Sequence, residues 1–353
     1  ADSNTADPHT TRHPSSGVTL TDQRGKKLVL DHPVTRLLTI PMPAASIVIA
    51  VDKTSKHLVG MHDASWVAMK DGILGQMFPD ALKIPHDVAG NDFAPNVESV
   101  LALKPEVVVQ WANQGSGVIA PMENAGLDVL GVTYGKQKDV ATWLTLFATL
   151  LGKPERAKAM IAKINTELKK VKSLTANVSG PAPKLLYFNR YIGGLKVAGP
   201  DTYNDWYIKL VGATNPASAL SEQALEGMVG VDVEQVLAWD PDVVVLGNFD
   251  DAMPDDIYGD KVWQDVSAVK SRRVYKVPLG GYRWDPPSHE SPLMWRWLSH
   301  IAYPHQSPPD LRHRIVDYYT FLYGYTPNDS QIDKILWTDV NDESANYGQF
   351  DAT

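Results

Sequence analysis

Apolar residues recur at intervals of three and four between Pro154 and Leu174, which is the pattern of a helix that buries one face. Pro154 suits the first turn, because the N–H that proline lacks would have no partner there. Residues 177–181, which include Gly180 and Pro181, favour a stop. At a rise of about 1.5 Å per residue, the pattern predicts one helix about 30 Å long near the middle of the chain.

Shorter runs on both sides of this helix predict strands. Residues 18–30 form two alternating runs around the turn Asp22-Gln23-Arg24-Gly25, which predicts a β-hairpin. Apolar runs that alternate with helical patterns occur at residues 37–40, 58–61, 184–189 and 273–278. This alternation is typical of parallel sheets covered by helices on both faces, so the sequence predicts an α/β fold.

One segment of the first half recurs in the second half. Residues 96–109 (NVESVLALKPEVVV) and 232–245 (DVEQVLAWDPDVVV) align without a gap and share a glutamate, a proline and a run of three valines. Each copy predicts a helix with an early glutamate, a turn and a buried strand. Chance matches small apolar residues more easily than a glutamate and a proline in register. We therefore infer an internal duplication, with the long helix between the copies.

The pattern divides the chain into five parts. They are a lead-in without regular structure (1–17), an N-terminal α/β lobe (18–152), an interlobe helix (153–176), a C-terminal α/β lobe (177–326) and an acidic C-terminal extension (327–353). A chain of 353 residues is long enough for two domains with separate cores.

Composition narrows the function. Hydrophobic residues make up 44% of the chain and charged residues 21%, as in ordinary globular proteins, and the net charge of -8 offers no basic stripe for nucleic acid. The chain contains no cysteine, which excludes thiolate catalysis, disulfides and cysteine metal sites. No apolar run approaches the roughly 20 residues that cross a bilayer. Because the chain begins at Ala1, we expect a secreted protein whose signal peptide is removed, without a lipid anchor and retained in a periplasm.

Taken together, these motifs resemble the substrate-binding proteins of ABC importers of class III (cluster A), the class that carries siderophores, haem and cobalamin. The resemblance covers roughly residues 18–326 and includes the hairpin, the repeated helix with its glutamate, the long helix, and motifs at 262–270, 273–275 and 323–325. The loop at 280–290 (GGYRWDPPSHE) resembles a subgroup with iron-chelate carriers and a molybdate/tungstate binder. The resemblance implies two Rossmann-like lobes, each a parallel sheet flanked by helices, joined by a single long backbone helix.

The resemblance also implies a role for the repeated glutamates. Glu98 and Glu234 match the carboxylates with which this class docks onto arginine pockets of two permease subunits. Alternatively, each favours the start of its helix through the helix dipole. A glycosidase pair would need carboxyls within about 5 to 10 Å of each other, whereas equivalent positions on two lobes would lie tens of ångströms apart. The chain also lacks HExxH, GxSxG and Walker motifs, so we expect a binding protein and not a carboxylate-dependent hydrolase or other enzyme.

Candidate ligand-binding residues follow the predicted strands, because ligands of open α/β lobes bind beyond the carboxyl ends of strands. Arg190 and Arg283 each lie among aromatic residues, where a guanidinium suits a carboxylate, a catecholate or an oxyanion. An ion pair of Arg283 with Asp285 or Glu290 is the alternative. The aromatic candidates, for which core packing is the alternative, are Trp66, Trp111, Tyr187, Tyr191, Tyr282 and Trp284. His62 and His289 are candidates for contact with a metal, against an ordinary hydrogen-bonded role.

Cationic groups with aromatic walls predict an anionic iron chelate, most simply a ferric siderophore, bound in an interlobe cleft. Haem would need an axial ligand, for which Tyr187, Tyr191 and His289 are candidates. Molybdate or tungstate would need only a compact cluster of Arg, Asn, His and N–H donors. Cobalamin is a further alternative. The sequence has no His-rich loop and no dense His/Asp/Glu cluster, which argues against bare zinc or manganese.

We expect a monomer without a cofactor or a nucleic-acid partner, which delivers a small metal complex to an ABC permease dimer with its ATPase. A single long helix resists bending where paired strands would hinge. We therefore expect a largely preformed cleft with modest lobe movement.

Overall fold

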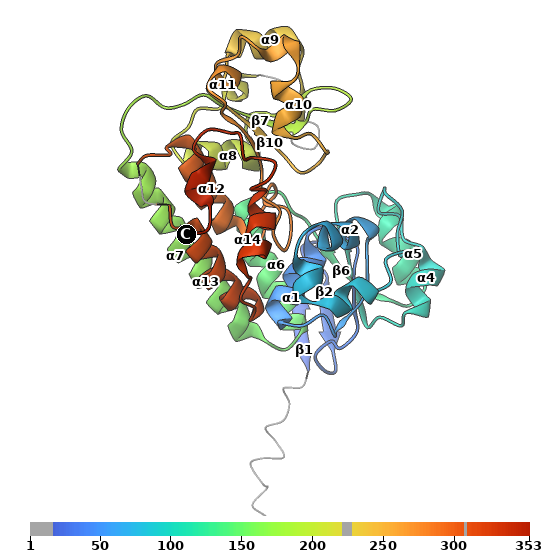
Figure 1. The fold of residues 1–353 in the computed structure, drawn as a ribbon. Helices are drawn as coiled ribbons and strands as arrows, with labels where there is room; N and C mark the ends of the chain where they lie inside the picture. Colours follow the sequence, from blue (N-terminus) through green and yellow to red (C-terminus); the bar gives the residue numbers. More distant parts are fainter. Residues whose placement is uncertain (1–16, 221–227, 307–308) are drawn as a thin grey trace, which may run out of the picture. The chain divides into compact units, whose positions relative to one another are not determined.

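The computed structural model describes residues 17–220, 228–306 and 309–353, and the chain separates into two compact units, traced in Figure 1. Unit 1 takes in the described residues up to Lys70 together with 78–134 and 138–161; unit 2 takes in 71–77, 135–137 and 162–353. The predicted lead-in lies, except for Gly17, outside the described residues. No described helix combines the length and the apolar content that a membrane span requires.

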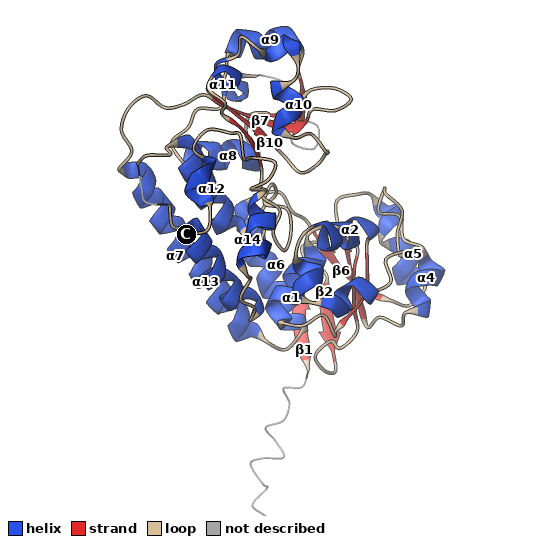
Figure 2. Cartoon of the chain, viewed as in Figure 1, coloured by secondary structure: helices blue, strands red, loops and turns tan. Residues whose placement is uncertain are grey.

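Unit 1 contains a parallel four-stranded sheet in the order β4-β3-β5-β6. Its strands are β3 (Leu37–Thr39), β4 (Leu58–Met61), β5 (Val107–Trp111) and β6 (Asp128–Val132). Every residue of β3 is buried, as are the first four of β5, because helices cover both faces of the sheet (Figure 2). The helices are α1 (Ala44–Asp52), α2 (Asp63–Asp71), α4 (Val97–Ala102), α5 (Ala120–Asn124) and α6 (Gln137–Leu150), with 3₁₀ turns at Pro79–Lys83 and Ser116–Val118.

The predicted hairpin is confirmed as β1 (Val18–Thr21) and β2 (Lys27–Leu30), which pair antiparallel. Its turn is bound to the edge of the sheet. The backbone N–H of Gln23 donates to the carbonyl of Gly131 in β6 over 3.0 Å, and the N–H of Gly131 donates to Asp22 Oδ2 over 2.8 Å. The hairpin therefore covers the outer edge of β6, where backbone groups would otherwise lack partners.

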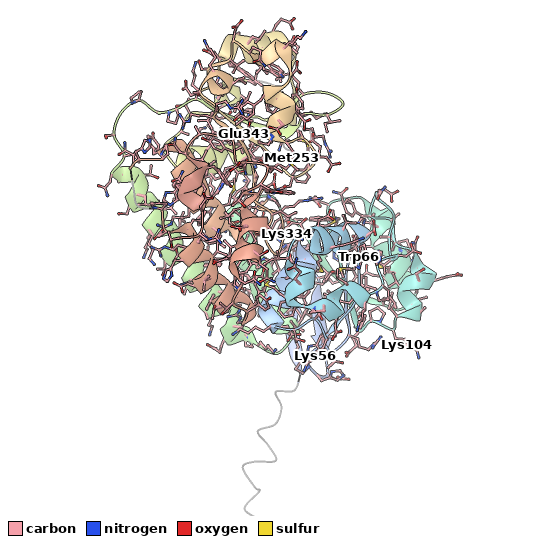
Figure 3. All side chains as sticks on the ribbon, in the orientation of Figure 1. Lys56, Trp66, Lys104, Met253, Lys334 and Glu343 are labelled. Atoms are coloured by element: carbon pink, nitrogen blue, oxygen red, sulfur yellow. The ribbon has the colours of Figure 1, made fainter. Side chains whose placement is uncertain are left out.

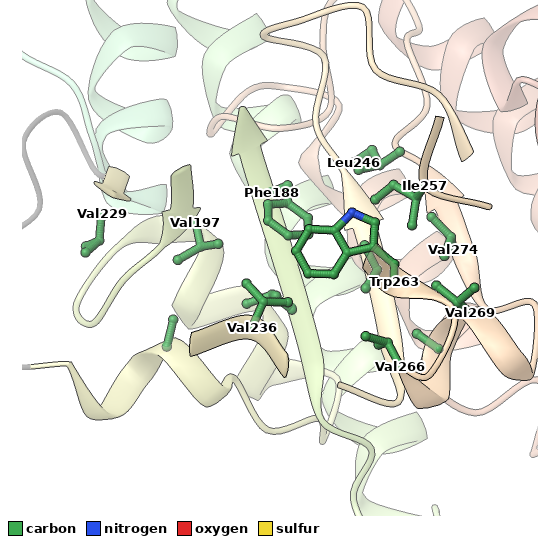
Figure 4. Close-up of a cluster of buried hydrophobic side chains, with 14 residues drawn as sticks. Phe188, Val197, Val229, Val236, Leu246, Ile257, Trp263, Val266, Val269 and Val274 are labelled. Atoms are coloured by element: carbon green, nitrogen blue, oxygen red, sulfur yellow. The ribbon is translucent and has the colours of Figure 1, made fainter. Parts of the chain in front are cut away.

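Unit 2 contains a mixed sheet in the order β11-β10-β7-β8-β9. Its strands are β7 (Leu185–Arg190), β8 (Lys196–Ala198), β9 (Met228–Gly230), β10 (Val243–Leu246) and β11 (Val274–Lys276). Strands β7, β10 and β11 run parallel, as predicted, whereas β8 and β9 pair antiparallel. The short connection between Arg190 and Lys196 explains why β8 runs antiparallel to β7, since a parallel crossover needs a dozen or more residues. On one face Trp263 packs among apolar side chains of the sheet (Figure 4).

Unit 2 also contains helices, which are blue in Figure 2. They are α3 (Leu74–Met77), α8 (Tyr203–Leu210), α9 (Val233–Trp239), α10 (Pro254–Tyr258), α11 (Ser267–Lys270), α12 (Ser291–Ala302), α13 (Leu311–Tyr323) and α14 (Asp329–Leu336), with 3₁₀ turns at Pro216–Ala219, Lys261–Trp263 and Tyr347–Phe350. The internal duplication is confirmed at the level of secondary structure, because α4 leads into β5 in unit 1 as α9 leads into β10 in unit 2.

The long central helix is confirmed as α7 (Pro154–Ala176), which begins at the predicted proline and ends two residues after the predicted Leu174. Ala157, Met160, Ile164 and Val171 of the predicted stripe are buried. The chain passes from unit 1 to unit 2 within this helix, between Ile161 and Ala162.

The division into units differs from the predicted domains in three places, at residues 71–77, 135–137 and 327–353. Residues 71–77 belong to unit 2, where the N–H of Ile73 donates to the carbonyl of Gly280 over 3.2 Å. Residues 327–353 also belong to unit 2 and are no separate extension, because Ile332, Ile335 and Phe350 are buried there. In the sequence, the many acidic residues of this segment make its few apolar positions hard to recognise as a buried face.

Candidate functional site

The carboxyl ends of β7, β10 and β11 lead into loops that carry the predicted arginines. The loop at 280–290 is held against these ends by Asp285, which is buried. Its carboxylate accepts hydrogen bonds from the hydroxyl of Tyr187 in β7 and, over 2.9 Å, from the backbone N–H of Asn248 after β10. Burial and the neighbouring Asp285 raise the pKa of Tyr187, so this phenol stays protonated and donates.

A second buried carboxylate, Glu290, holds the other end of the loop. It accepts from the hydroxyls of Tyr319 and Tyr323 in α13 and from Nε1 of Trp284, the last over 3.0 Å. Burial raises the pKa of Glu290, although these donors act in the opposite direction. Gly280 lies so close to Tyr319 and Glu290 that a Cβ there would overlap both, so this turn requires glycine.

The loop after β10 is fixed by Lys276, a buried lysine at the end of β11. Its ammonium group donates to three backbone carbonyls, those of Gly247 at 2.8 Å, Asp250 at 3.0 Å and Ala252 at 2.9 Å. Burial lowers the pKa of Lys276. The ammonium thus binds one carbonyl before Phe249 in the sequence and two carbonyls after it.

Both predicted arginines interact with Phe249. Arg190, the last residue of β7, donates from Nη1 to the carbonyl of Phe249 over 3.0 Å and is exposed. The guanidinium of Arg283 lies 5.2 Å from the centroid of the Phe249 ring and is half-buried. We call these three residues the arginine cluster. A half-buried guanidinium and an exposed one near the same aromatic residue are suited to binding an anion.

The alternative for Arg283, an ion pair within its own loop, is not found. Asp285 and Glu290 accept from the other donors described above, and no hydrogen bond or ion pair joins the Arg283 side chain to another residue of the described ranges. Because a guanidinium remains charged at physiological pH, Arg283 carries a positive charge without a bound counter-charge there.

Strand ends also carry buried polar atoms without hydrogen-bond partners in the described part of the chain. One such atom in unit 2 is Oδ1 of Asn189, the residue before the last one of β7. In unit 1 these atoms include Oγ1 of Thr39, at the end of β3, and Nε1 of Trp111, at the end of β5. Buried polar groups are normally paired, so unpaired ones at carboxyl strand ends suit contact with a ligand.

Comparison with known proteins identifies the family. The family described as periplasmic binding protein matches residues 50–279, more than half of the chain. A crystal structure of a periplasmic solute binding protein from Veillonella parvula is 32% identical, covers 92% of this chain and 98% of its own, and has a TM-score of 0.84. The chain belongs to the periplasmic binding protein family.

Two further comparisons concern named binding proteins. The molybdate-binding protein MolA of Haemophilus influenzae is 23% identical over 338 residues, which are 88% of this chain and 93% of MolA. Its molybdate-bound structure has a TM-score of 0.75 and covers 88% of this chain and 99% of its own at 21% identity. An iron-uptake system-binding protein of Bacillus subtilis is 26% identical over 59% of this chain and 68% of its own.

Other predicted residues of this periplasmic binding protein have internal partners. His62 of unit 1 is buried, and both of its ring nitrogens are engaged: Nδ1 accepts from the N–H of Ala64 and Nε2 contacts the carbonyl of Gly90, each over 2.9 Å. In unit 2, His289 is buried and its Nε2 lies 2.6 Å from the hydroxyl of Tyr323. No group of three or more His, Asp and Glu side chains in the described ranges is arranged to hold a metal ion.

The predicted aromatic residues divide into two groups by exposure. Tyr187, Tyr282 and Trp284 are buried, and the side chains of Tyr187 and Trp284 hydrogen-bond to Asp285 and Glu290 of the loop. Trp66, Trp111 and Tyr191 are half-buried.

The half-buried aromatic residues also have neighbours within their own units. Trp66, labelled on α2 in Figure 3, stacks on His86 with ring centroids 4.1 Å apart. The hydroxyl of Tyr191 donates to Asp260 over 2.9 Å. Trp111 contacts Phe93, with ring centroids 5.9 Å apart.

The repeated glutamates both lie on exposed helix surfaces. Glu98 is in the first turn of α4 and Glu234 in the first turn of α9, and neither side chain makes a hydrogen bond or ion pair with another described residue. Three residues further along each helix lies a leucine, Leu101 or Leu237, and each is 40% exposed. The duplication has therefore preserved an exposed Glu-Leu pair in each unit.

The sequence analysis missed Thr39 and Lys276. Lys276 had a readable signal, since it is the one charged residue in the otherwise uncharged run Val274–Leu279. Such a lysine needs several acceptors if the strand is buried. Thr39 had a weaker signal, its position at the end of a wholly buried strand just before Pro41.

Proposed function

We propose that this protein is the substrate-binding component of an ABC importer, that it acts in the periplasm, and that its cargo is an anionic metal species bound at the arginine cluster. Members of the family work with the permease and ATPase components of ABC transporters. The observation that carries the proposal is the half-buried guanidinium of Arg283, which has no ion-pair partner within the described residues and faces the ring of Phe249, whose carbonyl binds Arg190. An anion would supply that counter-charge.

The first candidate cargo is a compact oxyanion of the molybdate or tungstate type. Three of the predicted aromatic candidates, Tyr187, Tyr282 and Trp284, are buried, which favours a small anion over a broad one. His289 and Tyr187, candidates for an axial ligand to haem, have internal hydrogen-bond partners, which argues against haem. The similarity to a molybdate-binding protein over most of both chains supports the same choice.

The second candidate is the predicted ferric siderophore. The exposed guanidinium of Arg190 and the half-buried Tyr191 favour it, because they leave cationic and aromatic surface for a larger anion. The similarity to an iron-uptake binding protein supports it over a shorter length.

Titration of the intact chain distinguishes the candidates. Ten tryptophans provide a fluorescence signal, and the probes are molybdate, tungstate, sulfate, a ferric hydroxamate, a ferric catecholate and haemin. We expect molybdate and tungstate to bind at micromolar or lower concentration. Arg283→Gln should weaken binding about 10- to 100-fold, because a hydrogen bond to a charged group contributes about 1.5–3 kcal/mol. The matched control is Arg272→Gln, because Arg272 pairs with Glu343 in the same unit.

Three results of this titration would lead to different conclusions. Saturation by a ferric chelate alone, with the same sensitivity to Arg283→Gln, would select the second candidate. Binding that is indifferent to Arg283→Gln would remove the arginine cluster from the site. Absence of binding for every anionic probe would overturn the proposal.

For delivery of the cargo, we propose that Glu98 and Glu234 are the contacts with the two permease subunits. Each carboxylate is exposed, and each is accompanied by an exposed leucine at the equivalent position of the repeat. A carboxylate that binds a guanidinium gives directional recognition that salt weakens, and the neighbouring leucine adds apolar area. Repetition of the pair suits a partner with two similar subunits.

A further inference from the structure

A small cavity of about 120 Å³ in unit 2 is lined by residues of α7, α12 and α13, and Figure 1 labels these three helices. Its charged lining residues are Lys163, Glu167 and Lys170 from α7, Arg296 from α12, and Arg314 and Asp317 from α13. We call it the Arg296 pocket. It shares no residue with the arginine cluster.

Positive charge exceeds negative charge in this pocket. Glu167 is buried, and its carboxylate is approached by three of the four cations, at 3.2 Å by Lys170, 4.0 Å by Lys163 and 3.7 Å by Arg296. Asp317, the other carboxylate, is largely exposed and pairs with His313 over 3.3 Å. The fourth cation, Arg314, pairs with Asp310 over 2.9 Å, so one buried carboxylate serves the other three cations.

Arg296 is the buried group of the pocket, with only 6% of its surface exposed. Its Nη2 atom makes no hydrogen bond to a residue of the described ranges, and the Glu167 oxygen at 3.7 Å is beyond hydrogen-bond reach. Burial and the charge of Arg314 lower the pKa of Arg296, while the carboxylates of Asp310 and Glu167 act in the opposite direction. A guanidinium in this position stays charged and lacks an acceptor, which is unfavourable unless one is supplied.

We propose that the Arg296 pocket binds a small inorganic oxyanion of the phosphate or sulfate type. Such an ion supplies several acceptor oxygens and the missing negative charge at once, whereas water supplies only acceptors. A cavity of about 120 Å³ is large enough for an ion of a few heavy atoms. Binding links the part of α7 within unit 2 to α12 and α13, so we expect it to stabilise unit 2.

The test is calorimetric titration of the full chain with inorganic phosphate and with sulfate, in a chloride buffer of constant ionic strength. We expect one ion per chain. Arg314→Gln, Lys170→Gln and Arg296→Met should each weaken binding at least tenfold, and the first two keep the test valid if the buried Arg296 variant does not fold. Lys172→Gln is the control, because Lys172 is exposed on the same helix, and it should bind like the wild type.

Two further variants and probes fix the site and the ligand. Arg283→Gln, which alters the arginine cluster, should leave phosphate binding unchanged, so failure of this proposal is distinguishable from failure of the proposed cargo. Glycerol 3-phosphate should bind more weakly than inorganic phosphate, because the cavity is small. Absence of phosphate and sulfate binding by the wild type, loss of binding in Arg283→Gln with retention in Arg314→Gln, or tighter binding of the ester would each overturn the proposal.

Discussion

Buried ionisable side chains in unit 2 have pKa values moved in opposite directions by the same cause. Burial disfavours the charged form, so it raises the pKa of Glu290 and lowers that of Lys276. Each group fixes the position of a loop through its hydrogen bonds. Glu290 accepts from two tyrosine hydroxyls of α13, and Lys276 donates to three backbone carbonyls near Phe249. The position of the arginine cluster therefore depends on residues that do not belong to it.

His300 in α12 allows the effect of burial to be measured. Burial, with Arg296 and Arg314 acting in the same direction and Asp310 opposing, lowers its pKa from 6.5 to about 4. The unfolded chain therefore takes up a proton at higher pH than the folded chain does. The stability that neutral His300 provides is complete above about pH 6.5 and is lost as the pH falls toward 4.

We expect the free energy of unfolding to fall by up to about 3 kcal/mol between pH 7 and pH 4 on account of His300, at about 1.4 kcal/mol per pKa unit. Urea unfolding at both pH values measures it. In His300→Gln the decrease should be smaller by that amount, whereas in the control His305→Gln, an exposed histidine, it should match the wild type. An equal decrease in all three proteins would show that His300 does not titrate as described.

At the scale of elements, the C-terminal segment completes the sheet of unit 2. Strand β11 is an edge strand, and an edge strand leaves backbone groups without partners. Asn341 fills this gap: its Oδ1 accepts from the backbone N–H of Lys276 over 2.8 Å, and its Nδ2 donates to the carbonyl of the same residue over 3.2 Å. The N–H of Ala345 donates to the carbonyl of Arg272 over 2.7 Å.

Removal of the Asn341 amide should therefore be costly. We expect Asn341→Ala to lower the free energy of unfolding by about 2–4 kcal/mol, because a buried N–H and a buried carbonyl both lose a partner. Chemical denaturation measures this change. The neighbouring exposed Asp342→Ala is the control and should change stability by less than about 0.5 kcal/mol. Similar stabilities for the two variants would mean that the C-terminal segment does not support β11.

At the scale of the whole molecule, the duplication places one exposed Glu-Leu pair in each unit. The proposed docking role separates delivery from capture, because neither Glu98 nor Glu234 belongs to the arginine cluster. The helix dipole alone would account for a glutamate in the first turn, yet it would not require exposed leucines at both equivalent positions.

We expect the double variant Glu98→Ala/Glu234→Ala to abolish ligand delivery in vesicles that contain the cognate permease and ATPase. Ligand affinity, measured by the fluorescence titration, should stay unchanged. The control is Glu155→Ala/Asp265→Ala, which removes one exposed carboxylate from each unit and should deliver ligand normally. A parallel loss of affinity in the docking variant would refute the separation of roles.

Much of the fold follows from local pattern, because a helix or strand is specified by residues close together in sequence. The stripe of α7, the hairpin and both helix-to-strand units were predictable in this way. The antiparallel β8 and β9 were not, because the three-residue strands carry little periodicity. The packing of residues 327–353 was hidden for a different reason, since their charge outweighed a few apolar positions that become buried only against unit 2.

By itself, the sequence determined the α/β class and the duplication with its repeated glutamates, and it selected Arg190 and Arg283 as candidates. Only the tertiary structure decided that Arg283 has no counter-charge among the described residues, since that depends on Tyr187 satisfying Asp285 across 98 positions of sequence. It also decided that Tyr282 and Trp284 are buried. Residue type sets what a side chain is able to bind, and packing between distant segments sets which partners remain available to it.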